Sequence, residues 1–131
     1  MFRKISKCAV LDEAVATGVG LTPNVTDAST ITFALNTTDS ANFTVKIAGS
    51  ISDECPTFTS AVSAANQYEY IQVIDLEDNA GIDGDTGIAS AGTDINRMFE
   101  VNVTGLQWFA VVVTAWTAGK ITVQAVMFNN N

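Results

Sequence analysis

Carboxylate, thiol and aromatic side chains are the groups in this 131-residue chain that could do chemistry, because the sequence contains no histidine. Without imidazole, the Ser-His-Asp and Cys-His arrangements of hydrolases are impossible, and the commonest general base is missing. A glycosidase mechanism needs only two carboxyl groups. The acids available for it lie close together in the sequence: Asp75, Glu77, Asp78, Asp83 and Asp85. Nothing in their spacing singles out a pair, so we expect no catalytic residue and no enzyme.

Metal and cofactor sites are not expected either. Residues 78–87 read Asp-Asn-Ala-Gly-Ile-Asp-Gly-Asp-Thr-Gly, which places oxygen ligands on a glycine-rich backbone, as calcium sites do. The run lacks the alternating ligands and the final glutamate of a calcium loop, so solvated acids are the expectation and bound calcium is left as an alternative. The two cysteines, Cys8 and Cys55, have no CxxC spacing, which argues against zinc. Their pairing depends on how closely the fold brings them together, so it stays open.

Four aromatic residues are candidates for an interface: Tyr68, Tyr70, Trp108 and Trp116. Aromatic rings anchor protein interfaces, and they also stack on sugar rings. Packing in the core is the third interpretation of the same residues. A strand period of two would place Trp108 and Trp116 on the same face of one strand.

The charge distribution separates the start of the chain from the rest. The net charge is −8, and Arg3, Lys4 and Lys7 give the first seven residues +3, which leaves −11 on residues 8–131. Nucleic acid is therefore not an expected partner, because phosphate binding needs clustered cations. The apolar run after Lys7 is too short for a signal peptide, and we expect no membrane span. The basic start, with Phe2, is a candidate docking arm.

Alternation of apolar and polar residues predicts strands with one buried face. Residues 30–36 and 42–48 both show it, and the turn-forming residues between them predict an antiparallel hairpin. Residues 68–77, 98–104, 108–116 and 121–128 are further expected strands. Residues 108–116 are apolar on both faces, which indicates a central strand covered on each side or one buried in an interface.

Two segments depart from the strand pattern. Apolar residues between 58 and 65 lie at helical spacing, which predicts a short helix. Residues 78–92 predict an ordered loop with a short strand at 87–91. Many short strands and almost no helical period favour an all-β fold, an antiparallel β-sandwich of jelly-roll-like topology.

Several segments resemble the small β-sandwich structural proteins of tailed bacteriophages, of the capsid decoration or auxiliary head type. They are residues 48–56, Asn66-Gln67-Tyr68-Glu69-Tyr70-Ile71, Ile82-Asp83-Gly84-Asp85-Thr86-Gly87, and the run from Phe99 through Gly105-Leu106-Gln107-Trp108. The shared residues are turn glycines and strand aromatics. The resemblance implies a virion component on a capsid surface, often a trimer, or one at a fibre or tail position.

These observations together predict an N-terminal arm at residues 1–14, a single β-sandwich domain at 15–128 and a polar tail at 129–131. The expected function is that of a non-enzymatic virion protein, made in the host cytoplasm, that decorates or stabilises a phage capsid. Its expected partners are the major capsid protein or another virion protein and further copies of itself, with a trimer favoured. The alternative is a carbohydrate- or receptor-binding module of a phage fibre or tail. Phe2, Arg3, Lys4 and Lys7 would form the docking arm.

Overall fold

The alternating sequence forms an all-β structure. The computed structural model describes the backbone of residues 2–130 and the side chains of residues 6–129, and within that part every regular element is a strand. The strands are β1 (Phe2–Ala14), β2 (Gly18–Val19), β3 (Thr30–Ser50), β4 (Glu69–Tyr70), β5 (Val73–Asp75), β6 (Ala80–Ile82), β7 (Ile88–Ala91), β8 (Asn96–Asn102) and β9 (Trp108–Asn130). All pairings between them are antiparallel. The predicted all-β antiparallel fold is therefore confirmed.

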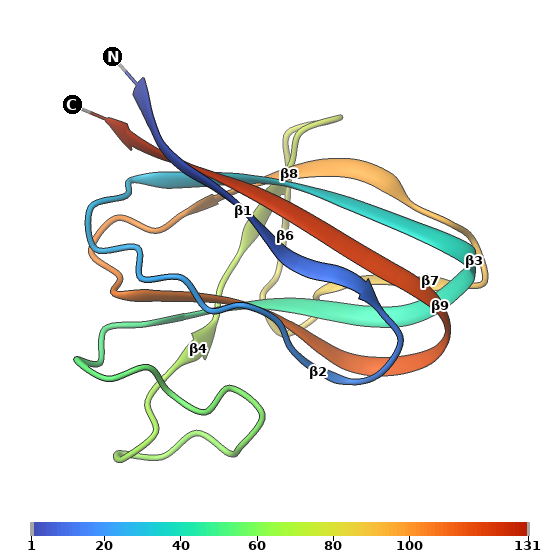
Figure 1. Cartoon of the computed structure of the whole chain (residues 1–131), viewed down its shortest axis with the longest axis horizontal. Coiled ribbons are helices and arrows are strands. Elements are labelled where there is room, and N and C mark those ends of the chain that lie inside the picture. The colour runs from blue at the N-terminus through green and yellow to red at the C-terminus, as the bar shows by residue number, and fades with distance from the viewer. Residues whose placement is uncertain (1, 131) are drawn as a thin grey trace.

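The fold is built around two long strands, β3 and β9. They pair with each other from Thr30 opposite Phe128 to Ser50 opposite Trp108. Both strands turn back at the same end of the molecule, near residues 38–42 and 116–120, as Figure 1 shows. The sheet is consequently folded over on itself into two facing layers.

The bend depends on backbone conformations that most residues avoid. Asp39 and Ser40 have positive φ angles of 64° and 55°, and Gly119 on β9 has a φ of 91°. A Cβ at Gly119 would lie 2.5 Å from Cα of Ala41, so glycine also allows the two strands to approach. The side chain of Asp94 accepts hydrogen bonds from the backbone N–H groups of Ala41 and Ser40, which stabilises the bend from outside.

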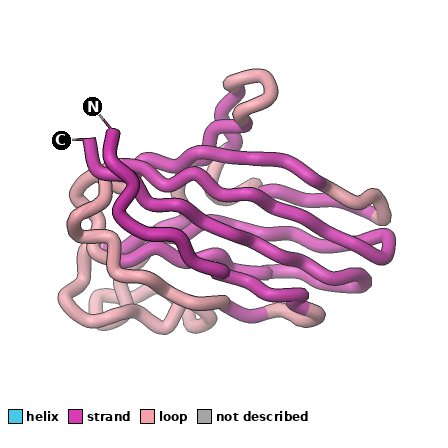
Figure 2. Tube along the Cα trace, turned by 45° about the horizontal axis from the view of Figure 1, so that its top comes forward, coloured by secondary structure: helices cyan, strands magenta, loops and turns pink. Residues whose placement is uncertain are grey.

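Each layer contains one half of both long strands. The first layer has the order β1–β9–β3–β8–β5–β6, and the second layer adds β2 to β9, and β4 and β7 to β3. Figure 2 shows the strands running along the molecule, with most of the irregular loops at one end. The β5–β6 hairpin projects away from the rest of the sheet in both views.

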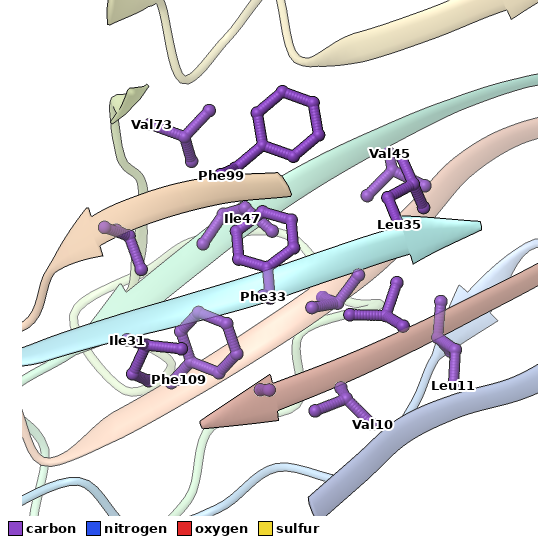
Figure 3. Packing of buried hydrophobic residues seen from close by; sticks show 14 of the residues in the cluster. Val10, Leu11, Ile31, Phe33, Leu35, Val45, Ile47, Val73, Phe99 and Phe109 are labelled. Atoms are coloured by element: carbon purple, nitrogen blue, oxygen red, sulfur yellow. The ribbon is translucent and has the colours of Figure 1, made fainter. Parts of the chain in front are cut away.

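The main hydrophobic core lies between the two layers. Ile31, Phe33 and Leu35 point inward from the first layer and meet Val45 and Ile47 of the second (Figure 3). The rings of Phe33 and Phe99 are stacked, with 5.4 Å between their centroids, and Phe33 is 6.5 Å from Phe109 across the core. Burial of this alternating face is the main favourable term that holds the layers together.

A second, smaller cluster lies on the outer side of the second layer. The loop of residues 51–68 runs over this side and places Phe58 and Tyr68 against Ala48, Ala110 and Val112. Residues 109–113 of the strand at 108–116 are therefore buried on both faces, as the double-sided apolar sequence predicted, whereas Ala115 is exposed. Its cover on the outer side is an irregular loop of the same chain.

Three expectations about local structure are wrong. Residues 30–36 and 42–48 do not pair with each other, because both belong to β3 and pair with successive parts of β9. The residues expected to form a helix, 58–65, are turns and bends around an isolated bridge between Ser63 and Asn66. The expected long strand at 68–77 is divided into β4, which pairs with β3, and β5, which pairs with β6 and β8.

The segment expected to be a separate N-terminal arm is an edge strand of the sheet. β1 pairs with β9 from Phe2 opposite Asn130 to Ala14 opposite Ile121, with three register shifts along the way. Val10 and Leu11 are buried in the main core. Residues 2–14 are therefore paired into the sheet, and part of this segment contributes to the core of the domain.

Two smaller expectations agree with the structure. The short strand predicted at 87–91 is β7, which pairs with residues 42–45 of β3. The strand predicted at 98–104 is β8, which starts two residues earlier. Among residues 2–130 there is no helix with the length and apolarity that crossing a membrane requires.

Candidate functional site

The aromatic residues expected at an interface are divided between two sites in the fold. Tyr68 is buried, and its hydroxyl donates a 2.6 Å hydrogen bond to the carbonyl of Ser60. Its ring lies 5.1 Å from that of Phe58 and 5.9 Å from that of Tyr70. Tyr68 therefore holds the loop of residues 51–68 onto the sheet, whereas Tyr70 is partly exposed.

The two tryptophans do not share a face. Trp108 packs on the outer cluster, and its indole N–H donates to the carbonyl of Ser52 over 2.9 Å. Trp116 packs against the main core, and its N–H donates to the carbonyl of Gly119. The register with β3 slips near Thr114, and this irregularity reverses the facing of the residues beyond it. Both indole rings are half-buried, and each holds a neighbouring loop or turn in place through its packing and its hydrogen bond.

A groove of about 640 Å³ opens beside Tyr70, at the β4 edge of the second layer. Its apolar lining includes the side chains of Tyr70, Leu106, Ile51 and Val62. Its polar lining includes Gln67, Glu69 and Asp85. Five stretches of the chain thus meet here, at residues 49–51, 62, 67–71, 85 and 106, and the groove that they form has both apolar and polar side chains.

Tyr70 has an unusual electrostatic environment. Partial burial raises the pKa of its hydroxyl, and the neighbouring Tyr68 and the carboxylate of Asp85 raise it further. The ammonium of Lys46 lies 5.1 Å from the centroid of the Tyr70 ring, close enough for a cation–π attraction. Burial, Tyr68 and Asp85 thus all favour the neutral form of the Tyr70 hydroxyl.

A second, more polar hollow of about 470 Å³ continues the groove past Tyr70. Glu69, Gln72, Asp83 and Asp85 line it. Asp83 is engaged within its own loop, because its side chain accepts the N–H of Asp85 over 2.8 Å. Within the described residues, no three carboxylate or thiol groups gather in a way that could hold a metal ion.

The carboxylates at β5 take part in an ion pair. Asp75 contacts the guanidinium of Arg97, and Glu77 lies 3.4 Å from the same group. The backbone N–H of Glu77 and the side chain of Arg97 lower the pKa of Asp75. The same contact raises the pKa of Arg97. These residues hold the base of the β5–β6 hairpin on β8.

Among the described residues, neither the cysteines nor Lys7 of the basic start line the groove beside Tyr70. Cys8 and Cys55 are both free, and burial raises the pKa of the Cys8 thiol. Lys7 is exposed on β1 opposite Val126. The side chains of Phe2, Arg3 and Lys4 lie outside the described residues, so the proposed docking role of this end stays a prediction.

Sequence reasoning identified Tyr70 and marked Asp85 as one of several acids, but it missed that the two lie at one groove. Ile51 and Leu106 come from loops that are distant in the sequence, and no local pattern marks them.

Comparison with known proteins identifies the fold. One solved structure, the crystal structure of the SPBc2 prophage-derived protein YomS, matches this chain with a TM-score of 0.73. The match covers 98% of this chain and 96% of that one, at 12% sequence identity. The two proteins share a fold over their whole length. No protein-family model and no curated protein matches the sequence.

Proposed function

We propose that this chain is a non-enzymatic structural protein of a bacteriophage particle, which decorates or stabilises the capsid through interfaces between subunits. The observation that carries the proposal is the end-to-end match of its fold with a prophage-derived protein. The match covers 98% of this chain and 96% of that one, so the two chains share the β fold as a whole. The proposed location is the capsid surface, after synthesis in the host cytoplasm.

The chemistry of the described side chains is compatible with a structural role. The carboxylates of Asp75 and Asp94 are used to hold a hairpin and the bend of the sheet. The net charge of −8 keeps a protein soluble at high copy number through mutual repulsion. A surface of this charge also disfavours nucleic acid as a partner.

The proposed partners are the major capsid protein and further copies of this chain, with a trimer favoured. Lys7 and the basic residues before it form one end of edge strand β1, next to the C-terminal end of β9 (Figure 1). This end is the proposed contact with the capsid. Electrostatic attraction at such a contact would act over about 8–10 Å at physiological salt.

Co-sedimentation with empty capsids tests this proposal. The wild-type protein is expected to pellet with capsids at a fixed ratio, and Lys7→Glu is expected to weaken that attachment several-fold. Lys120→Glu is the matched control, because it makes the same change in net charge at an exposed lysine near the bend of β9. Equal attachment of both variants would contradict the proposed contact, and a wild-type protein that ignores capsids would overturn the proposed function.

A further inference from the structure

The groove beside Tyr70 combines an apolar wall with polar side chains that can form hydrogen bonds. We propose that this groove binds a neutral saccharide. The inference does not rest on the proposed structural role, because the groove lies at the β4 edge of the second layer and the proposed capsid contact lies on β1. A sugar ring has an apolar face of C–H groups and a rim of hydroxyl groups, and the groove offers a partner for each.

The apolar wall contains side chains that the core does not use. Ile51 is 67% exposed and Val62 is 53% exposed, although both are large and hydrophobic. They border the same groove as Leu106 and Tyr70. Exposed apolar side chains that gather around one hollow are typical of a binding site, whereas isolated ones are normal on any surface.

The polar side of the groove selects the class of ligand. Gln67, Glu69 and Asp85 supply an amide and two carboxylates, which accept hydrogen bonds from neighbouring hydroxyl groups. A purely apolar ligand would cover these groups and leave them without partners, which costs free energy. The two carboxylates outnumber the nearby ammonium of Lys46, so the net negative charge disfavours phosphate, sulfate and uronic acid groups. A neutral saccharide satisfies both conditions.

Two glycines bring the walls of the groove together. A Cβ at Gly49 would lie 2.6 Å from a methyl carbon of Leu106, so glycine allows Leu106 to pack onto β3. A Cβ at Gly84 would lie 2.5 Å from the backbone of Tyr70, so glycine allows the loop that carries Asp85 to lie against β4. Both close approaches need a residue without a side chain.

The groove is also held in place before any ligand arrives. The ring of Tyr70 is oriented by the edge-on ring of Tyr68 and by the ammonium of Lys46. Tyr68 is fixed in turn by its hydrogen bond to the carbonyl of Ser60. A binding site whose side chains are already ordered loses little conformational entropy on binding.

Titration of the isotope-labelled full chain, followed by NMR of its backbone amides, tests the inference. The probes are short neutral oligomers of glucose, mannose, galactose and N-acetylglucosamine, with an oligogalacturonate as the anionic comparison. At least one neutral probe is expected to shift the amides of residues 49–51, 67–71 and 106, and the anionic probe is not. No shift with any neutral probe, shifts confined to other residues, or binding of the anionic probe alone would each overturn the inference.

Three variants locate the binding on the groove. Tyr70→Ala is expected to weaken affinity about tenfold, as expected for loss of an aromatic anchor. Asp85→Asn keeps the shape of an exposed side chain, and this change is expected to weaken the affinity several-fold. Asp12→Asn, a matched change on β1, is expected to leave affinity unchanged. Unchanged affinity in both groove variants would overturn the inference, and loss of capsid attachment by Lys7→Glu would not affect it.

Discussion

At the scale of single residues, Asp94 makes the most consequential polar contacts. Its carboxylate accepts hydrogen bonds from the backbone N–H groups of Ala41 and Ser40 and from the hydroxyl of Thr37. These hydrogen bonds lower the pKa of the Asp94 carboxyl group, and the bond from the N–H of Ala41 has the largest effect. The donors belong to the segment where β3 turns back through the positive φ angles of Asp39 and Ser40. One exposed side chain therefore stabilises a backbone conformation that is unfavourable by itself.

The lowered pKa of Asp94 predicts how stability depends on pH. As the pH falls below the ordinary aspartate range near ~3.9, the unfolded chain takes up its proton before the folded chain does. The stabilisation from Asp94 is consequently present at neutral pH and is lost as the pH falls through the folded pKa. Asp94→Asn should lower the melting temperature by a few degrees at neutral pH, and the difference from wild type should shrink in acid.

Thermal unfolding measured along a descending pH series checks this prediction. Asp75 also has a lowered pKa, but it is present in both proteins, so the difference between them isolates Asp94. Asp12→Asn serves as the control for the loss of one negative charge. A difference that stays constant down to acidic pH would contradict the assigned role of the carboxylate.

At the scale of elements, the irregular loop of residues 51–68 acts as a third covering layer. It leaves β3 at Ser50 and returns to the sheet at β4, and the side chains that dock it are Phe58 and Tyr68. Asn66 closes the loop by accepting the N–H of Thr57 and donating to the carbonyls of Thr57 and Ala61. The loop also provides Val62 and Gln67 to the groove. Its packing therefore determines the shape of the candidate site.

Phe58→Ala should destabilise the protein by about 3–5 kcal/mol, because Phe58 is 2% exposed and the change would leave a cavity between the loop and the sheet. Denaturant unfolding measures this loss, and hydrogen exchange should show faster exchange across residues 51–68. Phe58→Leu, which keeps most of the apolar volume, should cost less than about 1.5 kcal/mol. A nearly neutral Phe58→Ala would mean that the loop is not held by this contact.

At the scale of the whole molecule, the β5–β6 hairpin projects from the sheet, and we propose it as a surface for self-association. It places Leu76, 41% exposed, beside Met98, 57% exposed, and the N–H of Leu76 donates to the carbonyl of Met98. The two apolar side chains border the same shallow hollow. A stable subunit contact needs about 1,000 Å² or more, so this pair would form only its apolar centre.

Met98→Glu is therefore expected to convert the proposed oligomer to monomers, because it would place a charge in an apolar contact. Light scattering of the purified protein gives the mass directly. Gln124→Glu is the matched control on the exposed face of β9, and it should leave the mass unchanged. A wild-type protein that is monomeric would remove the basis of this prediction, and an oligomeric Met98→Glu protein would place the interface elsewhere.

The sequence by itself determined the class of the fold and the faces of most strands. The alternation of Ile31, Phe33 and Leu35 with polar residues is a local property, and burial of one face follows from it wherever the strand pairs. The absence of histidine likewise excluded whole classes of catalytic mechanism, because no arrangement of this chain can supply an imidazole. The double-sided apolar run at 108–116 correctly indicated a strand covered on both faces.

Only the tertiary structure decided which segments meet. Turn-forming residues at 37–41 suit a hairpin and a bend in one long strand equally well, and the choice came from pairing with β9, which is distant in the sequence. The irregularity near Thr114 places Trp116 and Trp108 on opposite faces of the sheet, and it too arises from the pairing of β9 with the distant strand β3. The groove at Tyr70 needs Ile51, Asp85 and Leu106 together, and their meeting depends on close backbone contacts at Gly49 and Gly84. Such contacts are properties of the folded chain, because no short stretch of sequence contains both partners.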